Sequence, residues 1–289
     1  MMSKSNRPGI CPGAALALKT EKGYNRQVNL FFGRQPLFRY LTSMFADPRT
    51  ALMFFLLAIP GRLMAISAHE FAHAWVADKC GDNTARMLGR LTLNPMKHLD
   101  LVGTLMMLLV GFGWAKPVPV NPRNYRNYRR DDLLVSIAGI AMNLILFALS
   151  FLICAVMVFA IVRGAGADGD QARDFVYYAA SIDSDYIAML SGSRLLGYVY
   201  EMLTYFVLVN VSLAIFNLLP VPPLDGYHVL NDMVLKRDLF ASGQVARAAT
   251  GILFLLMFTG YLGTGLSYIV SAVLSGMGSL AQALFAFIA

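Results

Sequence analysis

The pentapeptide His69-Glu70-Phe71-Ala72-His73 lies inside a long apolar run and has the pattern HExxH. On a helix its two imidazoles lie one turn apart on the same face, where both can bind a single zinc ion, and the glutamate lies beside the metal-bound water. Histidine and glutamate are unfavourable on an apolar run unless they have a partner or a role. We therefore expect a metal site here; the alternative is two core histidines beside an unrelated acid.

This apolar run belongs to a chain with the composition of a membrane protein. Of its 289 residues 57% are hydrophobic and 14% are charged, and several apolar stretches are about twenty residues long. The composition predicts an all-α polytopic membrane protein. The basic residues behind the net charge of +7 flank apolar stretches, as on the cytoplasmic side of a membrane, so we expect no nucleic-acid partner. Cys11, Cys80 and Cys154 lack zinc-ribbon spacing and are expected to be free thiols.

The chain divides into three regions. Residues 1–50 form a basic N-terminal region, which we expect to be partly disordered and partly, over 28–46, interfacial. Residues 51–240 form the core that carries the metal motif, and residues 241–289 form a C-terminal transmembrane hairpin. We expect about five spanning helices, at residues 51–77, 133–162, 198–219, 248–262 and 264–288.

A basic region separates the first two of these spans. Residues 79–132 carry nine Lys or Arg, which places them on the cytoplasmic side. Within them, residues 101–114 are apolar but number only about fourteen, fewer than a spanning helix needs, so we expect a re-entrant segment. The stretch 114–124 has three prolines among apolar residues, which favours a short extended strand near the active site that could pair with an extended peptide. The alternative is a plain loop.

A third metal ligand is expected after the span at 198–219. Two histidines need a third protein ligand, and a catalytic zinc keeps its fourth position open. The sequence NLLPVPPLDG at 217–226 has prolines that end the helix, so Asp225 can turn back into the bundle, and Gly226 permits the tight turn. Asp225 is therefore the expected ligand, with a helix-capping role as its alternative. The competing ligands are Glu201, His98 and His228.

The topology must bring Asp225 and the histidines to the same membrane face. Both lie near the C-terminal ends of their helices, so these helices must be parallel and an odd number of full spans must separate them. The stretch 133–162 is the only full span between them, so 101–114 must not cross the bilayer, in agreement with a re-entrant segment. This topology places the site nearer the cytoplasmic face. This arrangement puts the basic N-terminal region outside, against the positive-inside tendency. Arg62 shares roughly the face of His69 and is either functional or snorkelling to water.

These residues resemble the site-2 protease family of intramembrane zinc metalloproteases over roughly residues 51–240. The resemblance rests on HEFAH, on the fit of NLLPVPPLDG to the family pattern NxxPxxPxDG, and on their order. The stretches GRLTLNPMKHLD (89–100) and GWAKPVPVNPRN (113–124) are similar to the compact bacterial branch that lacks PDZ and CBS domains. Two departures are Ala138-Gly139-Ile140 for the usual Ala-Gly-Pro, and Tyr227-His228 after Asp-Gly.

The resemblance implies an intramembrane metalloprotease core at 51–240 that hydrolyses a peptide bond in or near a transmembrane segment of a membrane protein, in regulated proteolysis. It implies one Zn²⁺ per chain, bound by His69, His73 and Asp225. Glu70 would be the catalytic base, and Asn217 would help to bind the substrate backbone. At the start of the expected strand, Trp114 and Lys116 are further candidates for substrate binding. The implied location is the bacterial plasma membrane, with multiple passes through the bilayer.

Three other readings stay open at this point. A transporter or channel would also use broken helices and buried charge, but it would not need Glu70. A different metallopeptidase would use Glu201 as third ligand. An inactive relative would keep the metal as a structural site. A homo-oligomer is compatible with the sequence.

Overall fold

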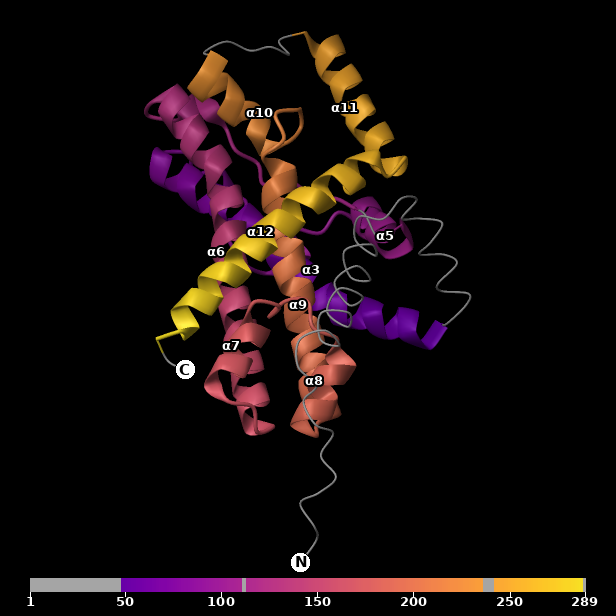
Figure 1. Cartoon of the computed structure of the whole chain (residues 1–289). Coiled ribbons are helices and arrows are strands. Elements are labelled where there is room, and N and C mark those ends of the chain that lie inside the picture. The colour runs from indigo at the N-terminus through magenta and orange to yellow at the C-terminus, as the bar shows by residue number, and fades with distance from the viewer. Residues whose placement is uncertain (1–47, 111–112, 236–241, 288–289) are drawn as a thin grey trace, which may run out of the picture.

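The computed structural model describes residues 48–110, 113–235 and 242–287, and all regular secondary structure among them is helical (Figure 1). This confirms the all-α prediction. The expectations for residues 1–47, including the interfacial stretch at 28–46 and the free thiol of Cys11, lie outside the described residues.

Three long helices form the centre of the molecule. They are α3 (Pro48–Cys80), α6 (Tyr128–Gly164) and α9 (Arg194–Asn217), and each packs against the other two. Capping defines where two of them start, because the Asn127 side chain accepts a hydrogen bond from the Arg130 N–H and the Ser193 hydroxyl accepts one from the Leu196 N–H. The apolar faces of α6 and α9 meet in a core that includes Phe151, Cys154 and Leu208. Cys80 and Cys154 are buried and free, as predicted.

Shorter helices occupy the two ends of this bundle (Figure 1). At one end, α7 (Gly169–Val176) and α8 (Ser184–Ser191) pack beside α6 and α9. At the other end, α10 (Asp225–Val229) continues into a π-helical turn, Leu230–Leu235, and contacts α6. The link from α3 to α6 contains α4 (Thr84–Met87), two 3-10 turns (Pro95–Lys97 and Pro122–Asn124) and α5 (Leu101–Val110).

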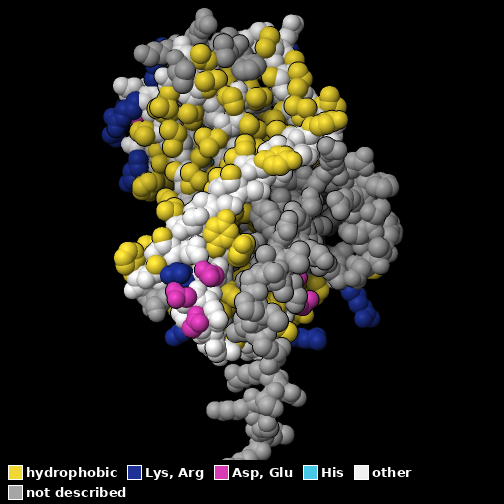
Figure 2. Space-filling model, viewed as in Figure 1, with side chains coloured by type: hydrophobic (Ala, Val, Ile, Leu, Met, Phe, Trp, Pro, Cys, Tyr) yellow, Lys and Arg dark blue, Asp and Glu magenta, His cyan; other side chains and the backbone are white. Residues whose placement is uncertain are grey.

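Three of the described helices are long and apolar enough to cross a bilayer: α6, α9 and α12 (Tyr261–Phe285). A further apolar helix, α11 (Gly243–Phe258), has only 16 residues. The expected count of about five spans is therefore not confirmed. Figure 2 shows hydrophobic side chains gathered over much of the exposed face, and exposed Leu, Ile and Val side chains recur along α6. An exposed apolar surface of this kind suits contact with lipid, so the chain is a membrane protein.

The C-terminal hairpin has other bounds than the expected 248–262 and 264–288. Helix α11 begins at Gly243, and the turn to α12 lies at Thr259 and Gly260. Gly260 has a φ of 76°, a left-handed conformation that glycine adopts without strain. Gly263, which separates the two expected ranges, lies inside the first turn of α12.

The expected strand at 114–124 is wrong as a regular strand. No strand occurs in the part of the chain that the structure describes; this stretch makes a single antiparallel bridge, between Leu99 and Ala115. The reason is that Pro117, Pro119 and Pro122 have no N–H to donate to a ladder. The segment nevertheless has no helical turn between Trp114 and the 3-10 turn at Pro122, and Asn121 has an extended backbone. The Lys116 N–H donates to the His98 carbonyl at 2.8 Å.

Helix α12 contacts the segment after α7 through a glycine. A Cβ atom at Gly278 would lie 2.3 Å from the Tyr177 carbonyl oxygen, whereas a Cβ atom at Gly276, on the same helix, would meet nothing within 4 Å. We expect Gly278→Ala to destabilise the detergent-purified protein by about 1–3 kcal/mol, as overpacked sites do, and Gly276→Ala to leave it unchanged or slightly more stable. Thermal unfolding followed by circular dichroism measures both. Equal unfolding temperatures for the two variants would contradict this packing.

Candidate active site

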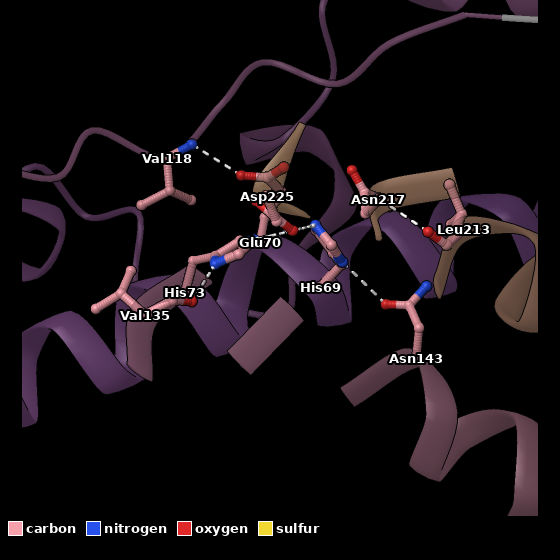
Figure 3. A network of polar contacts seen from close by, with 9 residues as sticks. All are labelled: His69, Glu70, His73, Val118, Val135, Asn143, Leu213, Asn217 and Asp225. Atoms are coloured by element: carbon pink, nitrogen blue, oxygen red, sulfur yellow. Dashed lines mark hydrogen bonds and ion pairs between the residues drawn. The ribbon is translucent and has the colours of Figure 1, made fainter. Parts of the chain in front are cut away.

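Two histidines and one aspartate converge where α3 meets α10 (Figure 3). The Nε2 atoms of His69 and His73 lie 3.0 Å apart, and each lies 3.3 Å from Oδ2 of Asp225. Ligand atoms about 2.0–2.1 Å from a tetrahedral zinc lie about 3.3 Å from one another, so this triangle has the size that zinc requires. Two imidazoles and a carboxylate are also a donor set found in catalytic zinc sites. In the described part of the chain this is the only such cluster of His, Cys, Asp and Glu ligand atoms.

The chain direction after α9 explains how Asp225 reaches the histidines. Helix α9 ends at Asn217, and the prolines that follow prevent it from continuing. The backbone then folds back so closely that a Cβ atom at Gly226 would lie 2.3 Å from the Leu218 carbonyl oxygen. Only glycine fits there without a shift, and Asp225 becomes the first residue of α10 beside α3. Gly226 itself lies in the first turn of α10, not in the expected tight turn, and the structure needs a glycine there for this close approach.

Helix α6 holds both imidazole rings from the opposite side. His69 Nδ1–H donates to Asn143 Oδ1 at 3.1 Å, and His73 Nδ1–H donates to the Val135 carbonyl oxygen at 2.7 Å. Because each Nδ1 carries the proton, each Nε2 is left with its lone pair for a metal. Val135, Gly139 and Asn143 are four residues apart and so lie on one face of α6.

Gly139 is the point of closest approach between α6 and this pair of rings. A Cβ atom there would lie 2.4 Å from His73 Nε2 and 2.5 Å from His69 Cε1. Any side chain would therefore push into the atoms that bind the metal. The absence of a side chain at this position lets the partner groups at Val135 and Asn143 reach the rings.

Glu70 lies on the same helix as the histidines and contacts the segment 114–121. Its Oε2 accepts a hydrogen bond from the Val118 N–H at 2.8 Å (Figure 3). The contact of Glu70 with this segment is thus made by a backbone N–H, and the two side chains predicted to bind substrate have other surroundings. Trp114 packs edge-on against Phe254 of α11, with ring centroids 6.4 Å apart, and Lys116 is exposed.

Asn217 lies at the end of α9 and on the Asp225 side of the cluster (Figure 3). Its side-chain amide donates to the Leu213 carbonyl at 3.0 Å, one turn earlier. This bond orients the side chain and leaves its oxygen as an acceptor for another group.

The competing ligand candidates lie elsewhere. Glu201 accepts hydrogen bonds from Tyr205 and from Ser184 of α8, near the other end of α9. His98 is buried and pairs with the Thr92 carbonyl at 2.7 Å, whereas His228 pairs with Asp132 at 3.1 Å. Arg62 is buried in α3. The structure therefore brings together His69, His73 and Asp225 and leaves these other residues outside the ligand cluster.

Sequence reasoning missed the groups that orient the ligands. Asn143 had a detectable signal, since an amide inside the most apolar run of the chain calls for a buried partner. The Val135 carbonyl and the Val118 N–H are backbone groups and carry no signal in a single sequence.

Comparison with known proteins gives the family of the chain. Residues 54–259 match peptidase family M50. The chain is 37% identical over 202 residues to the "Putative zinc metalloprotease YwhC" of Bacillus subtilis, which covers 70% of this chain and 80% of that protein. It is 31% identical over 181 residues to the "Putative zinc metalloprotease Rip2" of Mycolicibacterium smegmatis, an alignment that covers 61% of this chain and 56% of that protein. It is 30% identical over 210 residues to the "Putative zinc metalloprotease Rip2" of Mycobacterium tuberculosis, an alignment that covers 70% of this chain and 67% of that protein. No solved structure matches.

The family match spans most of the chain, and its range includes the ligand cluster of His69, His73 and Asp225 as well as Glu70. Zinc is accordingly the cofactor, and the activity is that of a metalloprotease. The chain belongs to peptidase family M50, the site-2 protease family of zinc metalloproteases.

Proposed function

We propose that this protein is an intramembrane zinc metalloprotease that hydrolyses a peptide bond in or near a transmembrane segment of a membrane-protein substrate, in regulated proteolysis. The observation that carries the proposal is the triangle of His69, His73 and Asp225, with ligand atoms 3.0–3.3 Å apart. Glu70 lies beside this triangle, between the two histidines on the same helix. A site that only stored or transported the metal would have no need of this carboxylate.

Each residue has a distinct task in the proposed reaction. His69, His73 and Asp225 hold the zinc, which when bound supplies a Lewis acid for the scissile carbonyl and the attacking water. Glu70 takes a proton from the water and passes it to the leaving amine. Asn217 binds the substrate backbone through its free acceptor. Because a peptide bond within a helix is shielded by its own turns, the substrate must be extended at the site, next to the segment that contains Trp114 and Lys116.

We further propose that α3 and α11 span the bilayer in addition to α6, α9 and α12. Residues 51–240 then form the catalytic core and residues 241–289 a transmembrane hairpin of a multi-pass protein in the bacterial plasma membrane. A single span, α6, separates α3 from α9, so the two helices that carry or precede the ligands run parallel. The site would lie nearer the cytoplasmic face, where residues 79–132 hold nine Lys or Arg.

The segment 101–114 is proposed to be re-entrant. Its helix α5 has 10 residues and is about 15 Å long, half of the bilayer core. Its two flanks are joined by the Leu99–Ala115 bridge, and Gly103 lies so close to the Trp114 carbonyl that a Cβ atom would be 2.1 Å away. Flanks that meet in this way support entry and exit on the same side.

We expect Asn143→Leu to lower zinc affinity about 10- to 100-fold, because it removes the acceptor that orients His69. Asn143→Asp keeps an oxygen at that position and should retain most of the affinity. Competition with a chelator, followed by metal analysis of the purified protein, measures both. The proposed role is wrong if the leucine variant holds zinc as tightly as the wild type.

Replacing Glu70 with Gln keeps the size of the side chain and removes the base. Cleavage should fall by about 10²–10⁴-fold while zinc stays bound, since Glu70 is not a metal ligand. The measurement is single-turnover cleavage of a model transmembrane peptide, with zinc determined on the same samples. Near wild-type cleavage by a zinc-loaded Glu70→Gln protein would exclude the mechanism, and no cleavage by the wild type would favour a transporter or an inactive relative.

Cysteine labelling tests the re-entrant segment. Met96 and Arg123 are exposed and flank 101–114, so single cysteines at these positions, in a protein without its three native cysteines, should react with a membrane-impermeant maleimide from the same side. Labelling from opposite sides would mean that 101–114 crosses the bilayer.

A further inference from the structure

The hydrogen bond to Glu70 comes from an N–H with an unusual sequence context. Val118 lies between Pro117 and Pro119, neither of which has an N–H. In this tripeptide Val118 alone can donate, and its N–H lies 2.8 Å from Glu70 Oε2. The Val118 side chain is buried in a small cluster with Ala74 and Ala85, which fixes the direction of the N–H.

A buried carboxylate anchors the chain on the C-terminal side of Val118. Asp82 is fully buried and accepts hydrogen bonds from the Asn121 N–H at 2.6 Å and from the Asn124 side-chain amide at 2.8 Å. It also accepts bonds from the Thr84 N–H and hydroxyl. Burial acts to raise the pKa of Asp82, but these hydrogen bonds outweigh it and lower the pKa below its ordinary value. Asp82 is therefore an anion that holds residues 121–124.

A buried guanidinium anchors the chain on the N-terminal side. Arg90 is 8% exposed, and its Nη2 donates to the Lys116 carbonyl at 2.8 Å and the Pro117 carbonyl at 3.3 Å. The Lys116 N–H in turn donates to the His98 carbonyl. Two buried charges of opposite sign thus bind the same short segment on either side of Val118.

Neither charge is used in an ion pair with the other. Burying a charge is unfavourable unless hydrogen bonds replace its water. Asp82 accepts such bonds from Thr84, Asn121 and Asn124, and Arg90 donates to two carbonyls of the segment 116–124. The result is a backbone segment that is held from both sides, although within the described residues its only strand pairing is the Leu99–Ala115 bridge. The only donor of the tripeptide 117–119 is then held at one oxygen of Glu70.

We propose that Asp82 and Arg90 are positioning residues for Glu70, which act by holding the Val118 N–H against its carboxylate. This inference rests on the proposed role of Glu70 as the base, and it adds the part of the chain that orients it. Without the two anchors the segment would shift, and Glu70 would sample orientations that do not face the attacking water.

The hydrogen bond itself can be tested without any activity. Pro-Val pairs occur at 117–118, 119–120 and 220–221, so protein labelled with ¹³C-carbonyl proline and ¹⁵N-valine gives three carbonyl-to-amide signals in detergent, and Val118→Ile identifies the Val118 signal. In zinc-loaded Glu70→Gln the Val118 signal should move, while Val221, whose N–H donates to the Leu219 carbonyl, should stay. An unmoved Val118 signal overturns the proposal, even if the wild type proves to be an active protease.

The role in positioning is tested by kinetics with a matched control. Asp82→Asn replaces one acceptor oxygen with an NH₂ group that faces a donor, whereas Asp78→Asn changes a carboxylate near the end of α3 that pairs with the exposed Arg86. We expect Asp82→Asn to lower kcat about 10- to 100-fold with zinc content and KM unchanged, and Asp78→Asn to leave kcat unchanged. Arg90→Gln should resemble Asp82→Asn, and Arg90→Lys, which keeps a cationic donor, should recover part of kcat.

Two outcomes contradict this role. An unchanged kcat in zinc-loaded Asp82→Asn would show that the anchor does not act on Glu70. Parallel loss of zinc and kcat would show that Asp82 supports the fold of the site as a whole. If Asp82→Asn does not fold, the Val118 signal of the Glu70→Gln protein still decides whether the amide holds the base.

Discussion

The site depends on the close approach of α6 to the histidine face of α3 at Gly139. A Cβ atom there would lie 2.4 Å from His73 Nε2, so the two helices can meet only without a side chain at this position. One turn to either side, the Val135 carbonyl and the Asn143 amide accept the Nδ1 protons of the two rings. The helix contact therefore sets the tautomer and the orientation of both metal-binding imidazoles at once.

The sequence predicted which residues the structure brings together in the ligand cluster better than it predicted the groups that orient them. HExxH has a fixed spacing on a helix, and the prolines before Asp225 force a break, so local rules suffice for His69, His73 and Asp225. Asn143 and Val118 reach the site from distant segments, and only tertiary packing determines those contacts. The strand expected at 114–124 does not form for a reason that is visible in the sequence itself. Its three prolines have no N–H to donate to the hydrogen bonds of a β-sheet.

The two ends of the bundle differ in the groups that they bury. At the end with α7 and α8, Tyr200 is fully buried and its hydroxyl links the Ile182 N–H to the Ala179 carbonyl, which closes that end with an apolar core. At the end with α10, buried Asp82 and Arg90 hold a proline-rich segment against Glu70. The buried charges that hold this segment thus lie at the end of the bundle that carries Glu70, whereas the other end packs around Tyr200.

The most direct test of whether His69, His73 and Asp225 form the metal site is the zinc content of two variants, Asp225→Ala and Glu201→Ala. The account predicts about one zinc per chain in the detergent-purified wild type and in Glu201→Ala, because Glu201 bonds to Tyr205 and Ser184 and lies outside the cluster. It predicts a sharp loss of zinc in Asp225→Ala, whose carboxylate lies 3.3 Å from both imidazoles. Full zinc in Asp225→Ala, or its loss in Glu201→Ala, would contradict the account.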